Sequence, residues 1–178
     1  DRRANVTETF LREGGLPPHV YPTTVKANSR DNVWTYLIPE LANSSFAMVV
    51  DSDIPVIAER AMYFPGFANP MPGKRLFEGG HESAGVAEPA TSWFHAEGAT
   101  GPLFDEYILV GNPGTTPAEV TFTFLLDSGQ TVVARGTVPA EGRFTLNVEL
   151  LEYHLTLPPD RGGLTMVSGD PSLLRATA

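Results

Sequence analysis

Alternating apolar and polar residues are the clearest pattern in the second half of the chain. From Val120 to Leu126 every second residue is apolar, and threonines separate the first of them. A strand that buries one face requires this period of two. The alternation returns in residues 131–138 and 144–150, with turn-forming residues between the stretches. The pattern predicts an antiparallel sheet with hairpin connections.

The first half predicts further strands with a less regular pattern. Apolar runs in residues 46–50 and 55–64 are typical of strands, with a short polar turn between them. Trp34 and Tyr36 would share one face of a strand, and an exposed face of this kind is suited to stack on sugar rings or on a protein. The alternative is that neighbouring elements cover both faces of that strand.

The 178 residues include 17 glycines and 16 prolines, which favour many short strands joined by turns over long helices. Residues 65–90 are rich in both and show no periodicity, so we expect a long ordered connection there. This predicts a first β-unit in residues 1–64, the connection, and a second β-unit in residues 91–178.

The two predicted units are similar in sequence. Residues 5–12 parallel residues 119–126, and residues 25–30 parallel residues 138–143, at an offset of about 113 to 116 residues. A repeat of this length is the size of a domain. The first copy has no counterpart of residues 93–114, so the chain is expected to hold about one and a half repeats. A sheet edge left open in this way predicts pairing with another strand, including that of a second copy in a homodimer.

The first copy differs from the second in chemistry. Glu8 stands where Phe122 stands, and Arg12 stands where Leu126 stands. A bare carboxylate in a dry core costs several kcal/mol. We therefore expect either that these two charges pair or that this end of the strand is solvated.

Charge and composition exclude several classes of protein. With 21 acidic and 12 basic residues the net charge is −9, which disfavours binding to nucleic acid or to an anionic membrane surface. No apolar run reaches the roughly 20 residues that span a bilayer. Without cysteine the chain has no disulfide, thiol nucleophile or cysteine metal site. Because it begins at Asp1 without a leader, we expect a processed product or an excised segment.

Two stretches contain residues with catalytic or metal-binding potential. His81, followed by Glu82 and Ser83, offers a base, a carboxylate and a hydroxyl, but adjacent residues rarely form a catalytic triad. His95 lies near three acidic residues, and with His81 this group is the weaker alternative for a divalent cation. The acidic residues in question are Glu97, Asp105 and Glu106.

A hydrolase centred on His81, His95 and Glu97 is the alternative function, in which metal or paired carboxylates would do the chemistry. The favoured interpretation is structural, because the spacing matches no zinc signature and the acids are numerous. Arg60 and Glu97 would likewise form a cross-strand ion pair, although Arg60 is also suited to clamp an anion. No cofactor is expected.

Four motifs in order resemble an uncharacterised repeat module of bacterial secreted and cell-surface proteins. They are residues 59–64 (ERAMYF), 79–85 (GGHESAG), 89–101 (PATSWFHAEGATG) and 111–114 (GNPG). The resemblance implies an immunoglobulin-like antiparallel β-sandwich at the cell surface or outside the cell. The recurring positions of that module match Arg60, His81 and Glu97 here, with no catalytic residue to carry over.

These observations together predict a non-catalytic β-sandwich module for adhesion, for recognition of carbohydrate or cell-wall polymer, for contact with another protein, or for spacing. The tentative ligand-binding residues are Arg60, His81, Glu97, Trp34 and Tyr36.

Overall fold

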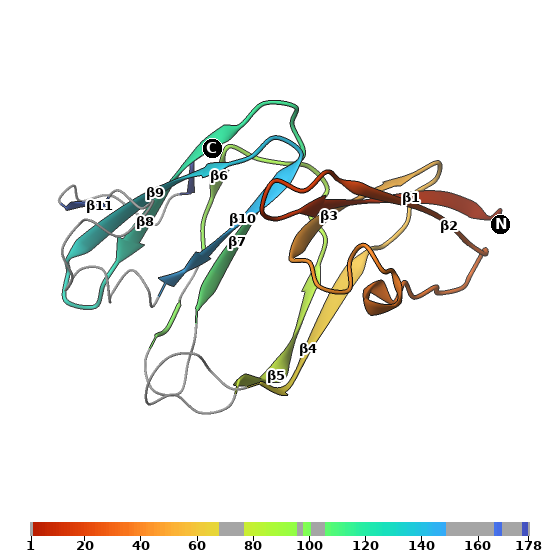
Figure 1. Cartoon of the computed structure of the whole chain (residues 1–178), viewed down its shortest axis with the longest axis horizontal. Helices are drawn as coiled ribbons and strands as arrows, with labels where there is room; N and C mark the ends of the chain where they lie inside the picture. The colour runs from red at the N-terminus through yellow and green to blue at the C-terminus, as the bar shows by residue number, and fades with distance from the viewer. Residues whose placement is uncertain are drawn as a thin grey trace.

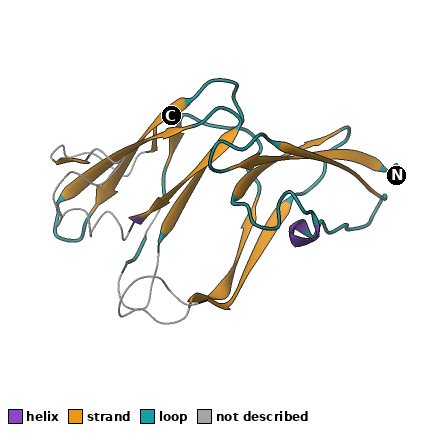
Figure 2. Cartoon of the chain, in the orientation of Figure 1, coloured by secondary structure: helices purple, strands orange, loops and turns teal. Residues whose placement is uncertain are grey.

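The computed structural model describes residues 2–67, 77–95, 98–100, 106–148, 166–168 and 176–177 (Figure 1). This part of the chain is built from antiparallel strands, which confirms the all-β prediction (Figure 2). The elements of the first half are β1 (Ala4–Arg12), β2 (His19–Val25), the 3₁₀ turn η1 (Thr35–Leu37), β3 (Phe46–Ser52), β4 (Glu59–Phe67) and β5 (Phe77–Ala84). Those of the second half are β6 (Ser92–Trp93), β7 (Tyr107–Asn112), β8 (Ala118–Leu125), β9 (Thr131–Val138), β10 (Gly142–Asn147), β11 (Met166–Ser168) and β12 (Ala176–Thr177).

The first sheet has the strand order β2-β1-β3. Along β1, Val6 and Phe10 are buried on one face, as the period of two requires. Glu8 lies on the same face and is only 9% exposed. The turn into β2 contains Gly14 and Gly15 at φ 78° and 74°, a conformation that other residues rarely adopt.

The second half contains a five-stranded sheet, β11-β9-β8-β12-β6, and the pair β10-β7. The inward residues of β8 and β9 form the main core together with Leu146 of β10. Ile108 and Val110 of β7 pack against this core, as do Phe124 and Phe144. The three alternating segments predicted from the sequence therefore all form strands, and their alternate residues fill the interior.

β4 and β5 form a two-stranded hairpin, which Figure 1 shows as a separate ribbon below β3. This corrects the sequence analysis in part, because residues 77–84 were expected to belong to an irregular connection and instead pair with β4. The strand expected in residues 55–64 begins only at Glu59. The glycine-rich sequence of β5 gives no alternation, but its backbone groups still pair, and the ring of Tyr63 lies close to Gly80 on the opposite strand.

A polar junction joins the first half to β10. The Glu13 carboxylate accepts hydrogen bonds from the Thr145 backbone N–H (3.0 Å) and from Thr145 Oγ1 (2.9 Å). Arg143 donates to the Phe46 carbonyl oxygen (2.9 Å) and to Thr145 Oγ1 (3.0 Å), and its Nε lies 3.8 Å from Glu13 Oε2. The Arg143 side chain is 11% exposed. Burial lowers the pKa of Arg143, whereas the nearby Glu13 raises it. The pair therefore sits in a partly dry contact between the halves.

A close backbone approach accompanies this junction. A Cβ atom on Gly111 of β7 would lie 2.7 Å from the Ala47 Cβ of β3, a distance that real side chains do not tolerate. Glycine at this position lets β7 and β3 pack against each other.

The hairpins β1–β2 and β8–β9 have matching registers. Ala4 pairs with Val25 in the first, and Ala118 pairs with Val138 in the second. Val25 and Val138 are aligned in the sequence comparison, and Ala4 and Ala118 directly precede aligned residues. The two hairpins thus share a register, and the second continues one residue pair further toward its turn.

The turns that follow the two hairpins also match. Asn28 has a φ of 52° and Glu141 has a φ of 46°, and they are the two non-glycine residues at positive φ in the described part of the chain. The fainter similarity of residues 48–50 to residues 165–167 has no such counterpart, because β3 pairs with β1 whereas β11 pairs with β9. The match therefore covers the hairpin and its following turn.

No helix in the described ranges is long and apolar enough to cross a membrane.

Candidate functional site

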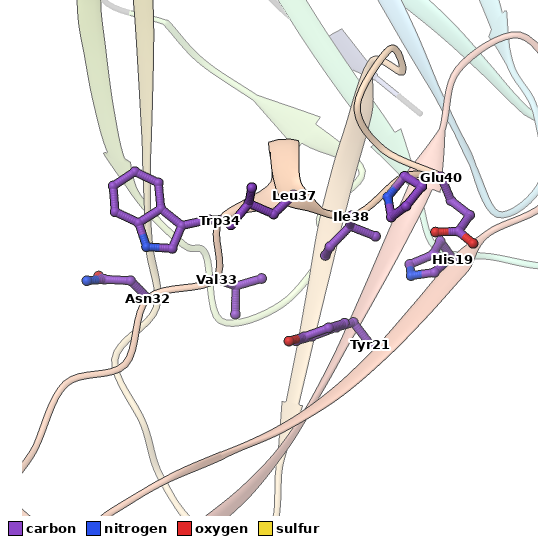
Figure 3. Close-up of a pocket in the computed structure, with 9 residues that line it drawn as sticks. His19, Tyr21, Asn32, Val33, Trp34, Leu37, Ile38 and Glu40 are labelled. Carbon is purple, nitrogen blue, oxygen red and sulfur yellow. The ribbon is translucent and has the colours of Figure 1, made fainter.

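An open hollow of about 460 Å³ lies between β2 and the segment that leads from β2 to β3. In β2 alternate residues are half-buried, and this pattern directs His19 and Tyr21 toward the hollow. Figure 3 shows these two rings on one side, with Val33 and Ile38 beside them and Trp34 at the far side of the hollow. The lining residues are His19, Tyr21, Asn32, Val33, Trp34, Leu37, Ile38, Pro39 and Glu40.

Trp34 and Tyr36 are both exposed, at 58% and 64%. Their rings meet edge to face, with centroids 5.9 Å apart and planes at 85°. The sequence analysis was wrong about their setting, because Trp34 immediately precedes η1 and the two residues do not share a strand face. The tight turn brings the rings together, and only Trp34 lines the hollow.

The outer wall of the hollow is fixed to the first sheet by Arg12 and Leu41. Arg12 Nε donates to the Pro17 carbonyl oxygen (2.7 Å), and its Nη1 donates to the Glu40 carbonyl oxygen (3.2 Å). The Leu41 backbone N–H donates to the Ile38 carbonyl oxygen (2.9 Å), and the Leu41 side chain is buried. Neither expected alternative holds for Glu8: in the described residues Arg12 binds backbone carbonyl groups and not Glu8, and Glu8 is buried and not solvated. The wall is therefore held in place without a ligand.

Two carboxylates lie behind the hollow. Glu8 is directly opposite Tyr21 in the β1–β2 pair. Burial raises the pKa of Glu8, and the negative charge of Asp31 raises it further. Asp31 in turn accepts a hydrogen bond from Thr23 Oγ1 (3.3 Å). This part of the first half therefore carries concentrated negative charge, and no basic side chain compensates Glu8 among the described residues.

Arg60 and His81 come together on the β4–β5 hairpin. Arg60 lies opposite Ser83 and His81 lies opposite Met62, so all four residues share one face of the ribbon. Diagonal neighbours of this kind are about 7–8 Å apart. His81 is exposed, while Arg60 is half-buried and close enough to lower the pKa of Arg143 by charge repulsion. Glu97, the third residue of this predicted site, lies outside the described residues.

His95 and Glu106 form the second association among the predicted residues. Burial raises the pKa of Glu106, and the nearby His95 opposes this shift. Gly98 lies directly against the Glu106 carboxylate, so that a side chain at this position would collide with it. In the described residues no three His, Asp or Glu side chains gather into a group that could hold a metal ion. Asp105 lies outside the described residues.

Asn112, which belongs to the motif of residues 111–114, makes hydrogen bonds to backbone groups that stabilise the fold. Its Nδ2 donates to the carbonyl oxygens of Thr116 (2.8 Å) and Pro139 (3.1 Å), and its Oδ1 accepts from the Gly114 backbone N–H (3.0 Å). The Asn-Pro-Gly motif therefore joins the turn after β7 to the end of β9. An asparagine before Pro-Gly is typical of such turns, so this role was accessible from the sequence.

The sequence analysis missed His19, which lines the hollow, and Asp31, which directly precedes the lining residue Asn32. Asp31 comes near Glu8 because β2 and the turn at Asn28 reverse the chain, and no local sequence pattern indicates this proximity. The comparisons with protein families, with curated proteins and with solved structures find no match for this chain. The resemblance to a bacterial surface module stays a prediction.

Proposed function

We propose that this chain is a non-catalytic, immunoglobulin-like β-sandwich module of a bacterial surface or secreted protein, which binds a partner through the hollow beside Trp34. Adhesion, recognition of a carbohydrate or cell-wall polymer, and contact with another protein are the roles that fit such a module. The observation that carries the proposal is the open hollow itself. It combines apolar walls with an exposed indole, and apolar concave surfaces with a few polar groups are typical of binding sites.

The setting of the candidate catalytic residues also favours a non-catalytic role. His81 is exposed on a hairpin, and His95 is exposed beside Glu106 in another part of the chain. An enzyme requires its acid, base or nucleophile to converge around a reacting atom. The hollow that the structure describes contains neither of these histidines.

We further propose that the two halves are related repeats, the first of them incomplete. The support comes from one contact that recurs with different chemistry. In the second half Phe122 stacks on Phe144, with centroids 6.1 Å apart. In the first half burial raises the pKa of Glu8 and the negative charge of the aligned residue Asp31 raises it further, so these two carboxylates lie near each other.

The third member of the contact recurs as well. Gly136 lies against Phe144, and a Cβ atom on this glycine would be 2.9 Å from the ring. The aligned residue of the first half is Thr23, which donates its hydroxyl hydrogen bond to Asp31. Asp31 thus contacts Thr23 as Phe144 contacts Gly136, and this recurrence supports a common fold. The junction between Glu13 and Arg143 would keep two such units in a fixed arrangement, as a spacer requires.

The binding function is tested by measuring retention of the protein on insoluble chitin, cellulose and peptidoglycan and on immobilised extended peptides. We expect saturable binding to at least one of these materials, without chemical change of the material. Trp34→Ala should weaken this binding at least tenfold. Tyr63→Ala is the matched control, because Tyr63 is an exposed aromatic residue that does not line the hollow, and this variant should bind like the native protein.

Two results would overturn the proposal. One is binding that Trp34→Ala leaves unchanged. The other is hydrolysis of a retained polymer that disappears in the His81→Ala and His95→Ala variants.

A further inference from the structure

The second half shows how a hollow of this kind is filled. β7 pairs with β10 so that Ile108 lies opposite Leu146 and Val110 lies opposite Phe144. Both β7 residues pack against the core of that half. An added strand therefore supplies the apolar side chains that close the sandwich at this place.

By the sequence alignment, residues 29–34 correspond to β10 of the second half. They follow the turn at Asn28 as β10 follows the turn at Glu141. Asp31 contacts the first sheet as Phe144 contacts the second. By the same alignment Val33 corresponds to Leu146, and Val33 lines the hollow.

Among the residues that the structure describes, no strand pairs with the backbone of this segment. Residues 29–34 run without a turn or a bend. In the described part of the chain, none of the backbone groups of residues 29–33 makes a hydrogen bond, and the Trp34 carbonyl oxygen accepts only from the Leu37 N–H (2.9 Å). Unpaired backbone donors and acceptors in a straight segment are a ready template for another strand.

We propose that residues 29–34 and the adjoining hollow accept an extended segment of a partner polypeptide, which adds as a β-strand in the place that β7 occupies in the second half. The inference rests on the proposed function in that both use the hollow, and it names a polypeptide strand as the partner. Main-chain hydrogen bonds give affinity in this mode of recognition, and alternate side chains give specificity.

The residues on the acceptor side specify the side chains of the incoming strand. A residue in the position of Ile108 would face Val33 and the apolar wall, so it is aliphatic. A residue in the position of Val110 would face Asp31 and lie near Glu8, which together concentrate negative charge. A lysine or arginine there would compensate a charge that the described residues leave without a basic partner. The partner strand therefore carries an aliphatic residue and, two positions later, a basic one.

The test uses peptides with the sequence of residues 106–113, labelled at one end and titrated with the whole protein by fluorescence anisotropy. One peptide carries Val110→Lys and the other keeps valine. We expect saturable binding of the lysine peptide that is at least tenfold tighter than that of the valine peptide. The backbone amides of residues 29–33 should gain protection from hydrogen exchange when the lysine peptide binds.

Variants of the protein check the assigned contacts. Asp31→Asn should remove the preference for lysine, and Asp31→Lys should transfer it to a Val110→Glu peptide. This reversal is a gain of binding, so a general loss of folding cannot mimic it. Val33→Asp should abolish binding, whereas Val20→Asp, an exposed change on the opposite face of β2, should leave it unchanged.

The outcomes separate this inference from the proposed function. If no peptide binds at millimolar concentration while a polysaccharide is retained through Trp34, the strand proposal is wrong and the binding function stands. Peptide binding that ignores the changes at Asp31 and Val33 also overturns the strand proposal. If no polymer is retained and no peptide binds, both the binding function and the strand proposal are wrong.

Discussion

The hairpins β1–β2 and β8–β9 share a register but differ in what lies on their inner faces. In the second, Phe122 is 2% exposed and stacks on Phe144 under the cover of β7. In the first, the aligned positions hold Glu8 and Asp31, and the described residues place no strand where β7 would lie. The comparison teaches that the same hairpin tolerates a carboxylate at a core position, although burial raises the pKa of that carboxylate. The first half holds an open hollow beside its hairpin, whereas the second half holds a packed core there.

The largest expected effect is loss of the apolar contact in the second half. Phe122→Ala should lower the free energy of unfolding by about 3–5 kcal/mol, because it removes a buried ring and leaves a cavity. Urea unfolding measures the change. Leu125→Ala on the same strand is the control and should cost less than about 1 kcal/mol, since Leu125 is exposed. Equal effects of the two changes would contradict the assignment of the core.

The second largest difference is expected between the aligned arginines Arg143 and Arg30, whose substitution should lower stability by unequal amounts. Arg143→Met should cost about 2–3 kcal/mol, because the buried guanidinium binds the Phe46 carbonyl group and Thr145 beside Glu13. Arg30→Met should cost no more than about 0.5 kcal/mol, because Arg30 is exposed and its hydrogen bond within the described residues goes to the Asn32 side chain two residues away. Thermal unfolding of both variants makes the comparison. If the two changes lower stability equally, the junction does not join the halves as described.

Substitutions of Gly136, which lies against Phe144, and of its aligned residue Thr23, which binds Asp31, should differ less in their effect on stability. Gly136→Ala should cost about 1–3 kcal/mol, since the new methyl group would overlap the Phe144 ring and force it to move. Thr23→Ala should cost only about 0.5–1.5 kcal/mol, the net value of its hydrogen bond to Asp31. A double variant, Gly136→Ala with Phe144→Leu, should recover part of the loss. If the double variant recovers no stability, overlap with the Phe144 ring does not explain the effect of Gly136→Ala.

The pH dependence of stability separates two carboxylates of the first sheet. The folded-state pKa of Glu8 is raised, so the folded protein holds this proton after the unfolded chain has lost it. Stability then falls as pH rises above the ordinary value of about 4.5 and levels off above the folded-state pKa. Glu8→Gln removes this penalty, so its advantage over the native protein should grow with pH, by at most about 1.4 kcal/mol per pH unit.

Asp53 should behave in the opposite way. The Asn5 backbone N–H lowers the pKa of Asp53, so its contribution is present above the ordinary carboxyl pKa and is lost as pH falls through the folded-state value. Asp53→Asn should therefore destabilise at neutral pH and have no effect in strong acid. Denaturation curves between pH 2 and pH 7 for both variants provide the measurement. If both Glu8→Gln and Asp53→Asn changed the free energy of unfolding in the same direction as pH rises, the two carboxylates would not differ in environment as described.

The sequence predicted the parts of this fold that depend on local periodicity. The alternation in Val120–Leu126 is determined by which side chains the sheet buries, and residue spacing alone reveals it. β5 was missed because its Gly-Gly sequence has no side-chain alternation, although its backbone pairs with β4. The short alternation around Trp34 was too brief to distinguish a strand from the tight turn η1.

The sequence predicted a residue of the candidate site only where a polar residue replaced an apolar one in the alternating pattern of a strand. Glu8 stood out because a carboxylate occupied an apolar position, and the structure buries it. Asp31 and His19 carried no such signal, since their place in the site depends on how β2 and the following segment fold back over β1. Contacts between segments far apart in the sequence decide this arrangement, and composition does not encode them.

Cross-linking between the protein and the added strand tests most directly whether the first half keeps the place of β7 vacant. The chain contains no cysteine, so an engineered pair gives no background. A Val33→Cys protein mixed with the Val110→Lys peptide that also carries Ile108→Cys should form a disulfide, because the alignment places these two residues directly opposite each other. A Tyr36→Cys protein should form it far more slowly. Equal cross-linking of the Val33→Cys and Tyr36→Cys proteins, or no cross-linking of the Val33→Cys protein, would contradict the claim that a strand can add beside residues 29–34.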